Sequence, residues 1–99
     1  MTREIEQSIL KKCLYSQEHL ARVIKIGCIF YYGEHIELFN LLKHCYKQDR
    51  KVDAMLLSDM ILGSELKYLT NSYVAEMKSP VANDLFDEYL KKVTESYIM

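Results

Sequence analysis

The groups best able to do chemistry lie near the middle of the chain, where Glu34, His35 and Glu37 occur within four residues. Carboxylate and imidazole groups can bind zinc and exchange protons near neutral pH. Both kinds of site require the groups to converge, but within one helical turn these three positions point in diverging directions. A metal-dependent enzyme built on them is therefore the less favoured alternative. We predict His35 to be a partly buried, hydrogen-bonded imidazole at the start of a helix.

Other signatures of enzymes are missing from the sequence. No two of the three histidines have the four-residue spacing of the helical zinc motif H-E-x-x-H. The three glycines form neither a phosphate-binding loop nor a G-x-G-x-x-G turn. We therefore expect no catalytic residue, no metal ligand and no cofactor in this chain.

The cysteines favour a reducing environment. Cys13, Cys28 and Cys45 are an odd number, have apolar neighbours and show no C-x-x-C spacing, so we predict buried small hydrophobic residues and no disulfide framework. The N-terminus lacks the apolar segment of a signal peptide. The longest apolar run, residues 26–32, is also far shorter than a membrane span. The protein is predicted to be cytoplasmic, with no membrane association.

Length and charge limit the remaining possibilities. With 99 residues, of which 49% are hydrophobic and 27% charged, the chain is predicted to form one domain over residues 1–99. The net charge of −1 argues against nucleic-acid binding through phosphates. That alternative would rest on Arg22, Lys25, Lys43 and Lys47. The eight tyrosines suit a protein interface better than base stacking. The candidates for surface anchors are Tyr15, Tyr32, Tyr68, Tyr97 and Met99.

Helical periodicity predicts an all-α fold, a compact bundle of about six short helices. The first helix covers residues 3–15, with Glu4 and Glu6 in the first turn, where the helix dipole favours negative charge. A second follows Ser16 as N-cap. Residues 26–32 form a buried connector, and a third helix covers residues 34–48. Its predicted inward residues are Leu38, Phe39, Leu42, Cys45 and Tyr46.

Three more helices are predicted in the second half of the chain. Val52 and Asp53 read as a hydrophobic staple and an N-cap before a helix over residues 54–62, which buries Leu56, Leu57, Met60 and Ile61. Ser64 caps a fifth helix that carries Leu66, Leu69, Tyr73, Val74 and Met77. Ser79-Pro80 opens the last helix, whose inward residues are Leu85, Phe86, Tyr89, Leu90 and Val93.

One segment carries a residue pattern that is more specific than helical periodicity. It runs Phe30-Tyr31-x-x-Glu34-His35-x-x-x-Phe39 and is followed thirteen residues later by Val52-Asp53. This pattern resembles the N-terminal domain of the DnaB family of bacterial replicative helicases, which has a similar F-Y-x-x-x-H-x-x-x-F run before a V-D helix start. Weaker support comes from Glu6-Gln7-x-Ile9-Leu10 and Ser79-Pro80-x-Ala82-Asn83. The resemblance covers residues 4–95.

The sequence departs from the family pattern in two places. Lys11-Lys12 follow the first Ile-Leu where the family has glycine, and Gly33 stands where proline is frequent. Such differences are typical of a divergent phage or plasmid member. They also leave open an alternative, the C-terminal helicase-binding domain of a DnaG-type primase, which is a similar helical bundle.

Both resemblances imply the same kind of function. The domain would take part in DNA replication without activity of its own, associating with copies of itself and docking primase or a loader. Its protein partner would be a primase or a replicative helicase, within a parent chain that is an ATP-dependent helicase or a primase. Phe30, Tyr31, His35, Phe39, Val52 and Asp53 are the residues that carry the family motif.

Overall fold

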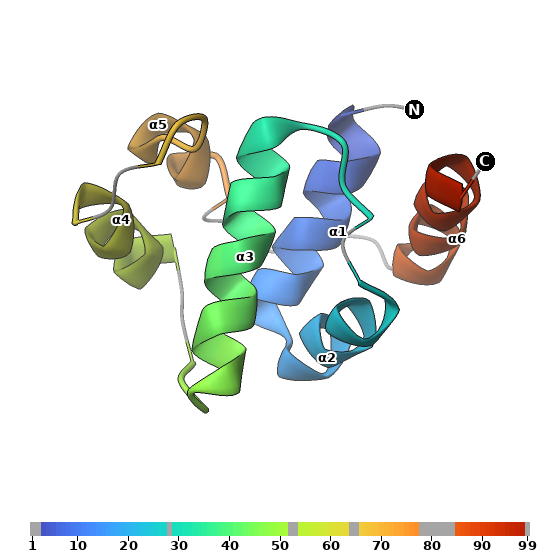
Figure 1. The fold of residues 1–99 in the computed structure, drawn as a ribbon, viewed down its shortest axis with the longest axis horizontal. Coiled ribbons are helices and arrows are strands. Elements are labelled where there is room, and N and C mark those ends of the chain that lie inside the picture. Colours follow the sequence, from blue (N-terminus) through green and yellow to red (C-terminus); the bar gives the residue numbers. More distant parts are fainter. Residues whose placement is uncertain (1–2, 28, 52–53, 64–65, 78–84, 99) are drawn as a thin grey trace.

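A computed structural model describes residues 3–27, 29–51, 54–63, 66–77 and 85–98. The fold over these ranges is all-helical and compact, without a strand, as predicted (Figure 1). The helices are α1 (Arg3–Tyr15), α2 (Gln17–Ile26), α3 (Gly33–Lys47), α4 (Ala54–Leu62), α5 (Asn71–Ala75) and α6 (Phe86–Ile98). No helix in the described ranges is long and apolar enough to cross a membrane.

Helix α1 has the predicted bounds, and α2 begins after Ser16 as predicted but extends through Ile26, which was assigned to the connector. The hydroxyl of Ser16 accepts a hydrogen bond from the backbone N–H of His19 and so caps α2. Gly27 ends this helix with a φ of 108°, a left-handed conformation that glycine adopts without a Cβ penalty. The connector that follows is irregular. It buries Ile29 and Phe30 as predicted, but Tyr31 lies in solvent, so the prediction of a buried connector is wrong at that residue.

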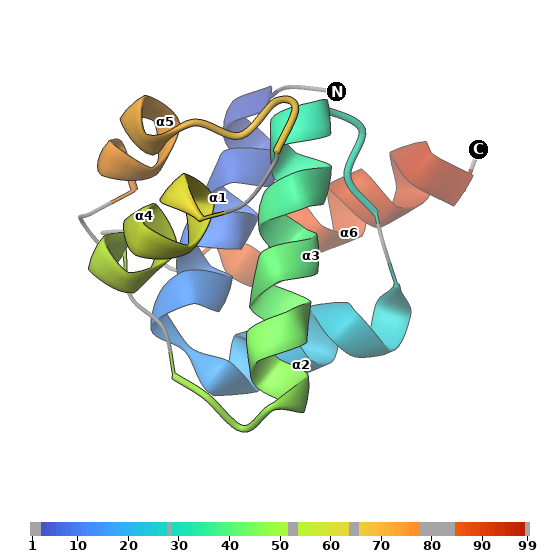
Figure 2. The ribbon, with the colours of Figure 1, turned by 60° about the vertical axis from the view of Figure 1, so that its left-hand side comes forward.

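Helix α1 is the centre of the bundle. Helices α2, α3 and α6 all pack against it, and α4 and α5 pack together on the side of α3 that faces away from α6 (Figures 1 and 2). The inward stripe of α1 meets side chains from its neighbours in one continuous core. Its most deeply buried members include Ile9, Leu10, Val23, Leu38, Phe39, Leu42, Leu57, Val74 and Met77.

The fifth helix is much shorter than predicted. It begins at Asn71, where the hydroxyl of Thr70 accepts a hydrogen bond from the N–H of Tyr73. The preceding residues 66–70 are irregular because the carboxylate of Glu37 on α3 accepts hydrogen bonds from three consecutive backbone N–H groups in this segment. Those groups are thereby held in a non-helical arrangement by a distant side chain, which local periodicity cannot reveal.

Two predicted core residues are exposed instead. Tyr46 is exposed because Cys45 already takes the inward position in that turn, and the next residue lies about 100° further around the helix. Leu85 is exposed and lies before α6, with its carbonyl accepting from the N–H of Tyr89. The inward stripe of α6 therefore starts at Phe86 and continues through Leu90 and Val93.

Four other predicted core residues are only partly buried at the edge of the core: Leu56, Met60, Leu66 and Tyr89. The helix over residues 54–62 has the predicted bounds. The predicted caps and starts at Val52, Asp53, Ser64 and Ser79-Pro80 lie outside the described residues.

Candidate functional site

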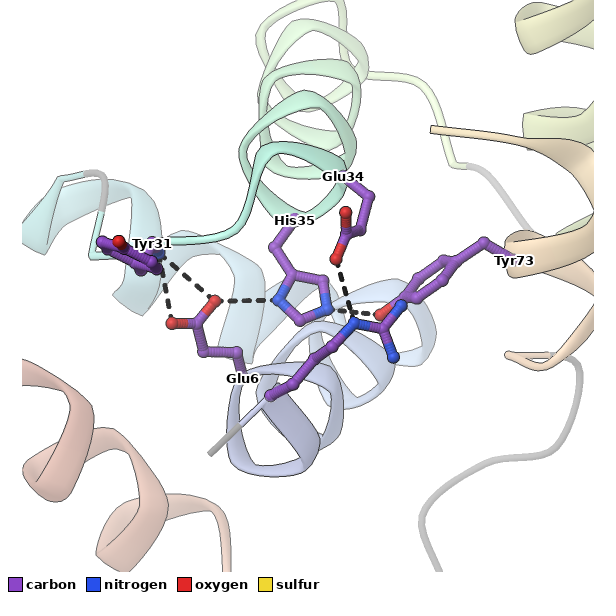
Figure 3. Close-up of polar contacts among 6 residues, drawn as sticks. Glu6, Tyr31, Glu34, His35 and Tyr73 are labelled. Carbon is purple, nitrogen blue, oxygen red and sulfur yellow. Dashed lines mark hydrogen bonds and ion pairs between the residues drawn. The ribbon is translucent and has the colours of Figure 1, made fainter. Parts of the chain in front are cut away.

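A buried polar network joins α1, the connector and α3 (Figure 3). Its centre is a contact between Glu6 and His35, both fully buried, with Nδ1 of the imidazole 2.8 Å from Oε1 of the carboxylate. The same carboxylate accepts the backbone N–H of Tyr31 at 3.1 and 3.3 Å. Glu6 thus satisfies two donors inside the fold. It lies in the first turn of α1, as predicted, but its side chain is buried rather than in solvent.

The other ring nitrogen of His35 extends the network to α5. Nε2 lies in hydrogen-bond contact with the hydroxyl of Tyr73. Burial lowers the pKa of His35 despite the nearby carboxylate of Glu6, and burial also raises the pKa of Tyr73. The neutral imidazole therefore donates from Nδ1 to Glu6 and accepts the Tyr73 O–H at Nε2. Every polar atom of the His35 ring has a partner.

An ion pair covers the outer side of this network. Nε of Arg3 donates to Oε1 of Glu34 at 2.9 Å, and its guanidinium lies 4.8 Å from the centre of the Tyr73 ring. Burial works to raise the pKa of Glu34, but the hydrogen bond and charge of Arg3 outweigh it and the pKa is lowered. Arg3 is itself half exposed, so the pair belongs to the rim of the network.

Three polar side chains near the start of α3 therefore contact separate parts of the fold, namely those of Glu34, His35 and Glu37. Glu34 reaches α1, His35 reaches Glu6 and Tyr73, and Glu37 holds the segment before α5 at 2.6 to 2.8 Å. The three backbone bonds lower the pKa of Glu37 against the opposing effect of burial. The predicted divergence and the predicted hydrogen bonding of His35 are confirmed, but its burial is complete. In the described part of the chain, no group of three His, Cys, Asp or Glu residues could hold a metal ion.

The family-motif residues divide between core and surface. The rings of Phe30 and Phe39 lie 5.4 Å apart in the core, and His35 packs edge-on to Phe30 at 6.4 Å. Tyr31, in contrast, is 80% exposed. Val52 and Asp53 lie outside the described residues.

Two of the predicted surface anchors come together at the start of α3. Tyr32 is the N-cap residue of α3 and packs edge-on against Tyr31 at 5.4 Å. The ring of Tyr68 lies so close to Gly33 that a Cβ there would come within 2.4 Å of it. Any side chain at position 33 would therefore force the ring of Tyr68 to move. Tyr31, Tyr32 and Tyr68 thus surround one end of α3.

The remaining predicted anchors lie elsewhere. Tyr15 is partly exposed at the end of α1, and its hydroxyl donates to the carbonyl of Met77 at 2.9 Å, so it also ties α1 to the turn that follows α5. The side chain of Tyr97 and the whole of Met99 lie outside the described residues.

Two of the three cysteines are buried thiols, as predicted. Burial raises the pKa of Cys13 to about 12, which keeps it protonated and unreactive near neutral pH. Burial likewise raises the pKa of Cys45, whose sulfur contacts that of Met60 at 3.7 Å. Cys28 lies outside the described residues.

Among the residues that the structure describes, the largest apolar exposure outside the motif is on α4. Met55 and Leu62 are 75% and 76% exposed and, being seven residues apart, lie on the same side of the helix. Asp59 is exposed between them, while Leu57 and Ile61 are buried on the opposite side. We call Met55, Asp59 and Leu62 the outer face of α4. The sequence prediction missed this face because it considered only the side of α4 that enters the core.

Comparison with known families identifies the chain. Searches among curated proteins and among solved structures find no match. The family model described as the DnaB-like helicase N-terminal domain matches residues 1–95, which agrees with the predicted resemblance and favours the helicase over the primase alternative. In this family the domain is a non-catalytic part of a replicative helicase. With its all-helical fold and a family match over nearly its full length, the chain belongs to the family of DnaB-like helicase N-terminal domains.

Proposed function

We propose that this domain is the self-association and docking module of a replicative helicase, and that primase is its principal partner, with a helicase loader as a second. The observation that carries the proposal is the family match over residues 1–95, since this family is a non-catalytic part of a DNA-replication motor. A parent chain with ATP-dependent helicase activity and a cytoplasmic location form part of the same proposal.

The chemistry of the surface supports a protein partner. Tyrosine and methionine supply large or adaptable contact area, and both are well exposed here, at Tyr31 and at Met55. The backbone at Tyr31 is held in place, because its N–H donates to the buried carboxylate of Glu6. A rigid scaffold with exposed apolar side chains loses little conformational entropy on binding.

Nucleic acid is not part of the proposal. Of the four cations that such a role would use, Arg22 is paired with Asp87 at 2.5 Å. We expect no binding of the 99-residue chain to single-stranded DNA even at low salt, where a phosphate-driven interaction is strongest. Fluorescence anisotropy with a labelled oligonucleotide measures this.

The proposal is tested by sedimentation velocity of the 99-residue chain, alone and mixed with the C-terminal domain of the cognate primase. We expect a faster-sedimenting complex in the mixture and concentration-dependent association of the chain alone. A chain that stays monomeric at every concentration and does not bind the primase domain contradicts the proposal.

A further inference from the structure

Helix α4 is apolar on two opposite sides. Leu57 and Ile61 are buried toward the rest of the fold, whereas Met55 and Leu62 lie on the outer face with about three-quarters of their surface in solvent. A helix with apolar residues on both sides is normally covered on both. Single exposed hydrophobic residues are common. Met55 and Leu62 are aligned on one side of a short helix, so one partner element could cover both.

The position of α4 leaves this face accessible. The helix packs against α5, and its other contacts go toward α3, where Met60 meets Cys45. Figure 2 shows α4 beside α3, at the periphery of the bundle and on the opposite side from α6. The outer face of α4 therefore points away from the core.

The charge on this face limits what can cover it. Asp59, the sole charged residue of α4, is exposed between the two apolar side chains. The last turn of α4 contains no basic residue, so the partial negative charge of the helix C-terminus adds to that of Asp59. A complementary partner presents a cation between two apolar groups. A second copy bound face to face would instead bring Asp59 against its own equivalent.

Resting on the proposed function, we propose that the outer face of α4 docks an amphipathic helix of the primase. A lysine or arginine of that helix pairs with Asp59, and apolar side chains one turn to either side cover Met55 and Leu62. This is recognition of one helix by a short apolar stripe of another, in which the apolar contacts give affinity and the central ion pair fixes register.

Charge and apolar variants of the outer face test this proposal. Asp59→Lys and the double variant Met55→Ser/Leu62→Ser alter only exposed side chains. Glu88→Lys on α6 and Ile26→Ser at the end of α2 are matched controls, since both side chains are exposed and lie away from α4. The measurement is isothermal titration of the C-terminal domain of the cognate primase into each 99-residue protein, at low and high salt.

Both α4 variants are expected to weaken binding about tenfold or more, while the two controls stay within about twofold of the wild type. The effect of Asp59→Lys is expected to shrink at high salt. If the wild type binds and all four variants bind equally well, the docking surface is elsewhere, and the proposal for α4 fails while the proposed function stands. If the wild type does not bind the primase domain, the proposal for α4 fails together with the primase part of the proposed function. Self-association that the α4 variants abolish would show a second copy on this face and overturn the proposal.

Discussion

Helices α3 and α4 are both rich in apolar residues. Helix α3 packs against α1 and α2 and forms the scaffold of the fold, whereas α4 exposes two apolar side chains to solvent. In α3 the polar side chains are used inside the molecule, since Glu34, His35 and Glu37 bind α1, α5 and the segment between α4 and α5. In α4 the one charged residue is exposed beside Met55 and Leu62. The difference teaches that apolar content alone does not distinguish core from interface. What separates the two helices is where their polar groups find partners.

Phe39→Ala should have the largest effect on the free energy of unfolding. Phe39 is buried in the middle of α3 and packs against Phe30, so its removal leaves a cavity. We expect a loss of about 3–5 kcal/mol, measured by urea denaturation. A loss below about 1 kcal/mol would mean that α3 is not the scaffold described above.

Glu6→Ala should destabilise the fold nearly as strongly. Without the carboxylate, the Nδ1–H of His35 and the backbone N–H of Tyr31 lose their buried partner. We expect a loss of at least about 2 kcal/mol, since two groups become unsatisfied and each costs about 1–3 kcal/mol. Glu4→Ala is the matched control, because Glu4 lies in the same turn of α1 but is exposed, and it should change stability by less than about 0.5 kcal/mol. Equal effects of the two variants would contradict the structural role of the network.

Stability should also depend on pH through His35. Because burial lowers its pKa in the folded state, the unfolded chain binds the extra proton first, and stability falls as the pH drops below about 6.5. Glu6 and Glu34 oppose this lowering and Arg3 adds to it. The slope contributed by His35 is at most about 1.4 kcal/mol per pH unit.

Thermal unfolding between pH 7 and pH 5 measures this slope. Glu34 and Glu37 contribute little to the slope in this window. Because their pKa values are lowered in the folded state, the stability that they provide is lost only as the pH falls below about 4.5. His35→Gln should flatten the dependence between pH 6.5 and pH 5. An unchanged slope in that variant would assign the pH dependence to other groups.

The smallest effect on stability is expected from the outer face of α4. Met55→Ser/Leu62→Ser removes two large apolar side chains, but both are already in solvent, so the free energy of unfolding should change by less than about 0.5 kcal/mol. Urea denaturation of this variant beside Phe39→Ala compares the two helices directly. A loss of 2 kcal/mol or more would show that the outer face of α4 contributes to the core after all.

Much of the bundle was predictable from local signals. The spacing of apolar residues and the cap at Ser16 located α1 and α2, and the bounds of α4 agreed with the prediction. Motif spacing also identified the family correctly. These features depend on residues that are neighbours in sequence, where periodicity and capping rules apply.

The polar network was not predictable from these signals. Glu6 and His35 are 29 residues apart, and His35 and Tyr73 are 38 apart, so only the packing of α1, α3 and α5 brings them together. The late start of α5 has a similar cause, because Glu37 binds backbone groups 30 to 32 residues away. A glutamate in the first turn of a helix reads as a surface residue until the partner that buries it is known.

Hydrogen exchange tests the division between scaffold and docking face most directly. Amide exchange of the 99-residue chain is compared with and without the C-terminal domain of the cognate primase, peptide by peptide. We predict slower exchange over α4 on binding, with α2 and α6 unchanged. Binding that slows exchange over α2 or α6 and leaves α4 unchanged would contradict the assignment of the outer face of α4 as the docking surface.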